Sequence, residues 1–98
     1  MRTLLLNPPS YKGFDGGSGS RYQARREVRS FWYPTWLAYP AGLMPESRLI
    51  DAPADGLDAD SVIRLANGYD LIVLSTSTPT VSHDVKFAEM IKNHYPHA

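Results

Sequence analysis

Cysteine is absent from the 98 residues of this chain. A disulfide, a thiolate nucleophile and a cysteine-ligated metal or iron–sulfur cluster are therefore excluded within it. Net charge is absent as well, because ten basic residues balance ten acidic residues. Without a strong positive field the chain is a poor candidate for general nucleic-acid binding, so we expect no nucleic-acid partner.

Long hydrophobic runs are also missing. No stretch approaches the roughly 20 apolar residues of a membrane span, and the run Leu4–Leu6 is too short for the core of a signal peptide. We therefore expect no membrane span and a cytoplasmic protein. Hydrophobic residues make up 43% and charged residues 20% of the chain, which indicates a small globular domain or part of a larger one.

The stretch "TLLLNPPS" predicts a short strand that stops abruptly. Leu4, Leu5 and Leu6 do not alternate with polar residues, which is typical of a strand buried on both faces in a parallel sheet. Pro8 and Pro9 follow, and the residue before a proline is pushed out of the helical region. The strand therefore opens the fold, and the chain turns away where it ends.

A first helix is predicted after a long connecting segment. Pro34 suits a first helical turn, and Leu37, Ala41 and Met44 can share one face of the helix that follows. Pro40 is expected to kink or shorten it.

A second strand and a second helix follow. The strand is centred on Leu49 and Ile50, with Pro53 stopping it. Asp58 has the character of a helix N-cap. The residues expected on the buried face of this helix are Val62, Leu65 and Ala66. Gly68 is expected to end the helix.

The third strand is the clearest element, since Leu71–Leu74 is continuously apolar. A polar turn over 75–80 leads into a last helix. Its predicted apolar face is spaced four, three, three and four residues apart. The members of that face are Val81, Val85, Ala88, Ile91 and Tyr95.

Strands that alternate with helices predict an α/β, Rossmann-like, three-layer α/β/α fold with a parallel sheet. In the flavodoxin-like order 2-1-3-4-5 the first and third strands are neighbours, and ligands bind between their carboxyl ends. The loops beginning at Asn7 and Ser75 would meet there. Three strands are about half of an ordinary domain of this kind, so the fold is expected to be truncated.

The turn 75–78 is the best local candidate for binding. Hydroxyls and backbone N–H groups between a strand end and a helix start suit a phosphate, an amide or a ring edge, and an ordinary cap before Pro79 is the alternative. Asp51 ends a strand and is either a turn former or a site acid. His83 follows the turn over 75–80 and is either a surface residue, which is the default, or a neighbour of the ligand. The glycine- and arginine-rich segment 10–30 is either a solvated loop or a contact for an anionic ligand or partner domain.

Four stretches together resemble a known family: "TLLLNPP", "YPTWLAYPAGLM", "SRLIDAP" and "YDLIVLSTST". They are similar to the N-terminal B12-binding domain of cobalamin-dependent radical S-adenosylmethionine (SAM) enzymes. The segment 7–38 is most similar to the hopanoid-biosynthesis branch of that superfamily. The likeness runs over essentially the whole chain.

The resemblance implies that residues 1–98 are the N-terminal part of a cobalamin-binding domain. A radical SAM barrel and its 4Fe-4S cluster would belong to the parent protein, because this cysteine-free chain cannot cleave SAM and is not catalytic alone. In the parent, the implied reaction is a radical rearrangement of the hopanoid head group toward a cyclitol ether. The residues that the resemblance directs toward cobalamin are Asn7, Pro8, Pro9, Ser75, Thr76, Ser77 and Thr78.

One departure from the family opens an alternative. The Asp-x-His-x-x-Gly motif that supplies a cobalt-ligating histidine is missing, and His83 follows the third strand, which is the wrong place for it. The chain could instead be a degenerate structural domain that binds no cofactor and docks on the catalytic barrel. In either case Leu71–Leu74 would be an exposed apolar edge, so a homodimer through this strand is expected.

Overall fold

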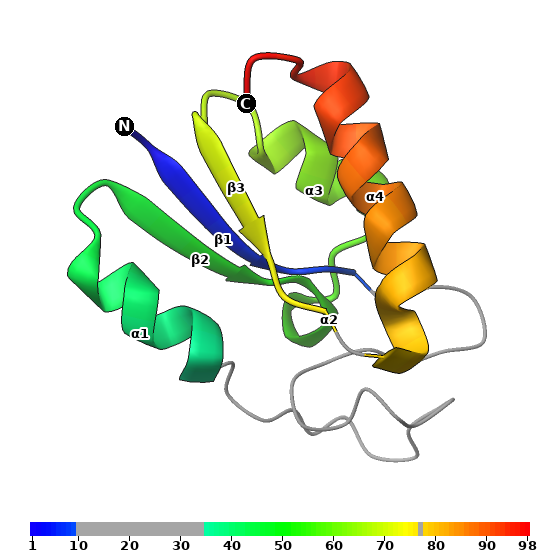
Figure 1. Cartoon of the computed structure of the whole chain (residues 1–98), viewed down its shortest axis with the longest axis horizontal. Helices are drawn as coiled ribbons and strands as arrows, with labels where there is room; N and C mark the ends of the chain where they lie inside the picture. Colours follow the sequence, from blue (N-terminus) through cyan, green and yellow to red (C-terminus); the bar gives the residue numbers. More distant parts are fainter. Residues whose placement is uncertain (10–34, 77) are drawn as a thin grey trace.

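A computed structural model describes residues 1–9, 35–76 and 78–98 of the chain. Its sheet contains β1 (Thr3–Asn7), β2 (Ser47–Asp51) and β3 (Leu71–Leu74) in the order β2-β1-β3, with both pairings parallel. Figure 1 shows β1 between the other two strands. The predicted parallel sheet with the first strand beside the third is therefore confirmed. The predictions for segment 10–30, for Pro34 and for Ser77 lie outside the described residues.

Helices cover both faces of this sheet. On one face α1 (Thr35–Leu43) packs against β1 and β2, and on the other lie α3 (Ala59–Leu65) and α4 (Val81–His94) (Figure 1). The register sorts the strand side chains between the two layers. Leu4 and Leu6 belong to the core beneath α3 and α4, whereas Leu5 is buried on the opposite face. The Rossmann-like three-layer arrangement is confirmed.

The central strand is buried over its whole length, as its unbroken leucine run predicts. All five residues of β1 are buried, because neighbouring strands cover its two edges and helices cover its two faces. The prediction that Leu4, Leu5 and Leu6 form a strand buried on both faces is therefore confirmed.

The prediction that Pro53 ends the second strand is wrong in detail. β2 already ends at Asp51, and Pro53 lies in the first turn of a short helix, α2 (Ala52–Asp55), which the sequence analysis did not predict. Proline is tolerated there because the first helical N–H groups need no intrahelical partner. Gly56 ends α2 with a φ of 67°, a conformation that favours glycine.

The predicted start of α3 is confirmed. The Asp58 carboxylate accepts a hydrogen bond of 2.8 Å from the Ser61 backbone N–H. Val62 and Ala66 are fully buried as expected, and Ile63 is buried in addition. The N-cap therefore fixes where the helix begins, and its apolar face packs onto the core.

The cap at Asp58 gives a pH-dependent contribution to stability. The hydrogen bond from the Ser61 backbone N–H holds the pKa of Asp58 below its ordinary value of 3.8. A lowered folded-state pKa stabilises the fold above the unfolded value, and this stabilisation is lost as the pH falls through the folded pKa. Asp58→Asn keeps a capping oxygen that does not titrate. We therefore expect the urea midpoint of the native chain to fall more than that of Asp58→Asn when the pH drops well below 3.8. Equal falls in both chains would contradict the assignment.

The buried face of α4 differs from the predicted one. Val81 and Val85 were expected inside, yet both are exposed, Val85 by 52%. The buried residues are Asp84, Phe87 and Ile91, while Ala88 and Tyr95 are partly buried. This orientation of the helix buries the larger Phe87 side chain instead of two valines. It also lets the hydroxyl groups of Thr76 and Thr80 donate hydrogen bonds to the Asp84 carboxylate.

Candidate functional site

The carboxyl ends of the three strands carry a chain of hydrogen-bonded side chains. Asn7 ends β1, Asp51 ends β2 and Ser75 directly follows β3. Asn7 Nδ2 donates to Asp51 Oδ1 at 2.8 Å, and Ser75 Oγ donates to Asn7 Oδ1 at 3.2 Å. The Ser75 backbone N–H also donates to the Leu6 carbonyl at 3.0 Å. We call these three side chains the switch-point rim, because they join all three strand ends at one edge.

A second cluster fixes the turn between β3 and α4. Thr76 Oγ1 and Thr80 Oγ1 donate to the same atom, Asp84 Oδ2, at 2.6 and 2.8 Å. Thr80 and Asp84 are almost fully buried, whereas Thr76 is exposed. The buried carboxylate on α4 therefore holds the turn in place from beneath, and Thr76 stays at the surface beside the rim.

The loop after β1 lies against the start of α4. His83 Nε2 is 3.3 Å from the Pro9 carbonyl oxygen, and the ring is partly buried. Pro8 and Pro9 are both buried. The two prolines therefore direct the chain from the end of β1 toward α4, beside the rim.

The structure brings together several residues that the sequence predicts for the site. Asn7 contacts Ser75 directly, Thr76 follows it, and Asp51 contacts Asn7. Thr78 is exposed and begins a short 3-10 turn, Thr78–Thr80.

Asp84 is the site residue that the sequence analysis missed. Its available signal is the spacing of four residues from Thr80, which allows a hydroxyl and a carboxylate to meet on one helical turn. Its partnership with Thr76 depends on how the turn folds and could not be read from spacing.

The arrangement gathers polar side chains at the edge of the sheet where open α/β folds bind ligands. In open α/β sheets, ligands bind outside the carboxyl ends of the strands where the strand order reverses, here between β1 and β3. The rim and the turn supply amide, hydroxyl and carboxylate oxygens at that point. In the part of the chain that the structure describes, no group of three or more His, Cys, Asp or Glu residues is placed to hold a metal ion.

Comparisons with protein families, with curated proteins and with solved structures found no match for this chain. Within residues 1–9, 35–76 and 78–98, no helix is both long and apolar enough to cross a membrane.

Proposed function

We propose that this chain is the cobalamin-binding module of a radical SAM enzyme, within a parent protein that rearranges a hopanoid head group toward a cyclitol ether. The observation that carries the proposal is the switch-point rim, in which Asn7 and Ser75 link the carboxyl ends of β1 and β3. The four sequence stretches that resemble the family support the choice of cofactor. The proposal includes a cytoplasmic location and a C-terminal radical SAM barrel as partner.

The polar groups at the carboxyl ends of β1 and β3 suit a ring that carries carboxamide groups around its rim. The corrin ring carries several carboxamide side chains, and Ser75 and Thr76 offer hydroxyl groups of matching polarity, while the buried Asn7 holds Ser75 in place. Cobalamin would supply the cobalt chemistry, while these residues would bind and orient the ring. SAM and the 4Fe-4S cluster would belong to the barrel.

A bulky side chain at Ser75 tests the site. Ser75 is partly buried and hydrogen-bonded to Asn7, so Ser75→Trp would fill the edge between β1 and β3. We expect the dissociation constant for hydroxocobalamin to rise at least about tenfold, which corresponds to a loss of about 1.4 kcal/mol. The measurement is retention of the cobalamin absorption after gel filtration, with circular dichroism to establish that the variant folds.

Ser82→Trp is the matched control, because Ser82 is exposed on α4. The titration uses the 98-residue chain and a longer chain that adds the strand expected after residue 98. Unchanged affinity in Ser75→Trp would refute the site. Absence of cobalamin from both native chains would refute the cofactor.

The surface of α1 favours a second candidate, a structural domain that docks on the catalytic barrel. α1 carries no charged residue, and its only buried side chain is Leu37. Trp36 is 86% exposed, Leu43 is 85% exposed, and Tyr39 is also exposed. A helix that is apolar all round is normally buried, so this face has the character of a contact with another domain. Under this candidate the chain binds the barrel and takes up no cobalamin.

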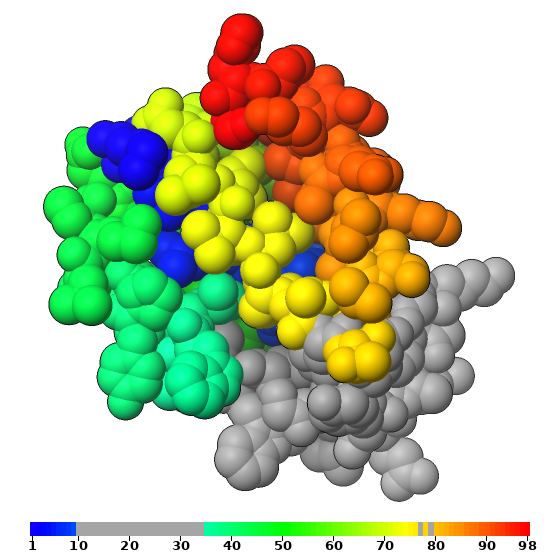
Figure 2. Space-filling model, viewed as in Figure 1, coloured from blue at the N-terminus to red at the C-terminus, as the bar shows by residue number. Residues whose placement is uncertain are grey.

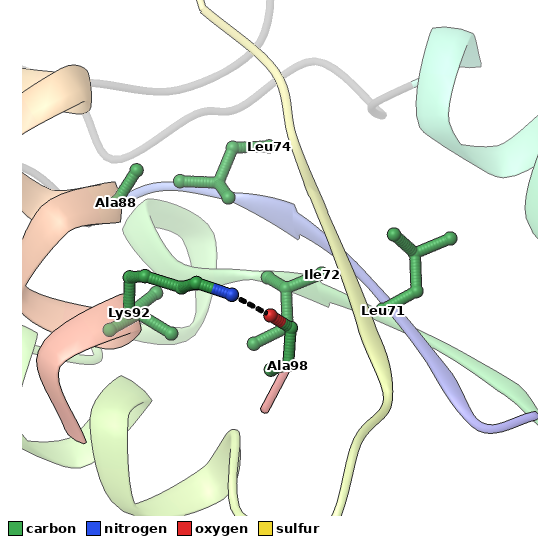
Figure 3. Close-up of a pocket in the computed structure, with 7 residues that line it drawn as sticks. Leu71, Ile72, Leu74, Ala88, Lys92 and Ala98 are labelled. Carbon is green, nitrogen blue, oxygen red and sulfur yellow. Dashed lines mark hydrogen bonds between the residues drawn. The ribbon is translucent and has the colours of Figure 1, made fainter. Parts of the chain in front are cut away.

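The edge strand β3 supports a homodimer as a further part of the proposal. Among the described strands, β3 pairs only with β1. An open apolar groove of about 290 Å³ lies between β3 and α4, lined by Leu71, Ile72, Leu74, Ala88, Ile91, Lys92 and Ala98. Figure 3 shows Ile72, Leu74, Ala88 and Lys92 around it, with Lys92 Nζ donating to the Ala98 backbone oxygen.

The two edges of the sheet differ in how they resist pairing. The β2 edge carries the exposed charge of Arg48, whereas β3 has neither a charge nor a proline. Figure 2 shows β3 open to the surface between α1 and α4. Charged residues on edge strands hinder the addition of further strands, so β3 is the edge at which a second copy would pair.

A further inference from the structure

The orientation of the Asn7 amide is fixed by its neighbour on β2. The two ends of an asparagine amide are normally hard to tell apart, and the hydrogen-bond partners decide between them. Asp51 Oδ1 lies 2.8 Å from Asn7 Nδ2, and a carboxylate oxygen only accepts. The NH2 end of Asn7 must therefore face Asp51, so its carbonyl end faces Ser75.

This orientation determines where the Ser75 hydroxyl hydrogen points. Asn7 Oδ1 is an acceptor at 3.2 Å from Ser75 Oγ, so the single hydroxyl hydrogen of Ser75 is directed to it. The hydroxyl hydrogen of Thr76 is directed in the same way to Asp84, because Thr76 Oγ1 lies 2.6 Å from a carboxylate oxygen of that residue. Both hydroxyl hydrogens are thus used inside the protein. Lone pairs are what these hydroxyls can offer to a ligand.

We propose that Ser75 and Thr76 act as hydrogen-bond acceptors toward the ligand, so that the group docking on them is a donor, either a carboxamide NH2 or a hydroxyl. Ser75 is partly buried and Thr76 is exposed, so neither residue is closed off from a ligand. A phosphate or carboxylate would bring acceptor oxygens against these lone pairs. Of the three ligand groups that the sequence allowed at 75–78, these two hydroxyls therefore favour the amide over the phosphate. This inference rests on the proposed function and specifies which chemical group of the ligand binds at Ser75 and Thr76.

The first experiment needs no ligand. In NMR spectra of the chain, we expect slowly exchanging hydroxyl protons for Ser75 and Thr76. Asp51→Asn removes the acceptor-only partner of Asn7 and allows its amide to invert, while Asn still fits the same space. We therefore expect faster exchange of the Ser75 hydroxyl proton in Asp51→Asn and no change at Thr76. Rapid exchange of both protons in the native chain would overturn the inference.

The second experiment compares hydroxocobalamin with its monocarboxylic acids, in which one carboxamide has become a carboxylate. We expect at least one of these acids to bind at least about tenfold more weakly to the native chain, and Asp51→Asn to reduce that ratio. Equal binding of every acid would overturn the inference while leaving cobalamin binding intact.

Inorganic phosphate is the probe that remains decisive if no corrinoid binds. Shifts of the Ser75 and Thr76 amide resonances on adding phosphate would overturn the inference. Their absence, together with slow hydroxyl exchange, would support it even though the cobalamin proposal had failed.

Discussion

Phe87→Ala is expected to destabilise the chain by about 3–5 kcal/mol, because it leaves a cavity at the centre of the packed layer. Phe87 is only 2% exposed and belongs to the core with Leu4, Leu6 and Val62. Small domains have a total unfolding free energy of about 5–15 kcal/mol, so one substitution removes a large part of it. The measurement is the free energy of unfolding in urea, followed by circular dichroism.

Val85→Ala is the matched control on the same helix. Val85 lies two positions before Phe87 in the sequence but is 52% exposed, so we expect a change within about 0.5 kcal/mol. Together the two variants determine which face of α4 packs on the sheet. A larger loss in Val85→Ala than in Phe87→Ala would show that the helix is turned the other way.

Val73→Lys is expected to abolish self-association through β3. Val73 is 37% exposed and Leu71 is 39% exposed on the open edge strand. A lysine is one of the residues by which natural edge strands avoid pairing. We expect the native chain to form dimers at high concentration and Val73→Lys to stay monomeric, as measured by sedimentation equilibrium.

The geometry of an antiparallel pair explains why position 73 is decisive. Side chains directly opposite each other must lie on the same face of the sheet, and the side-chain period is two. A two-fold pairing of β3 with a second copy is therefore centred on Ile72 or on Val73. Two lysines would then meet directly or diagonally across the axis, and like charges opposite each other are destabilising.

Val85→Lys makes the same substitution at an exposed valine of α4 and should leave the dimer intact. A native chain that remains strictly monomeric by sedimentation at high concentration would refute pairing through β3.

The strand order could be predicted because continuous apolar runs and prolines mark the elements of a parallel sheet. The buried face of α4 could not be predicted, because two faces of this helix satisfy the helical period equally well. One contains Val81 and Val85, and the other contains Phe87. The observed face buries Phe87 and lets the Asp84 carboxylate accept from Thr76 and Thr80, and these donors come from a turn whose shape depends on the whole fold.

The same distinction holds at the site. Asn7, Ser75 and Thr76 could be predicted because each follows directly from where a strand ends. The direction of their hydrogen bonds could not, because it depends on Asp51, which lies 44 residues from Asn7 in the sequence and touches it only after the sheet has formed.

The central place of β1 in the sheet has a consequence for synthesis on the ribosome. Asn7 meets Asp51 only after 44 further residues and Ser75 after 68. Translation at 5–20 residues per second therefore leaves the leucines of β1 without their second neighbouring strand for roughly 3–14 seconds. During this time the most deeply buried segment of the domain is an unprotected apolar peptide in the nascent chain. Chaperones that bind extended hydrophobic segments would meet β1 before the sheet can close over it.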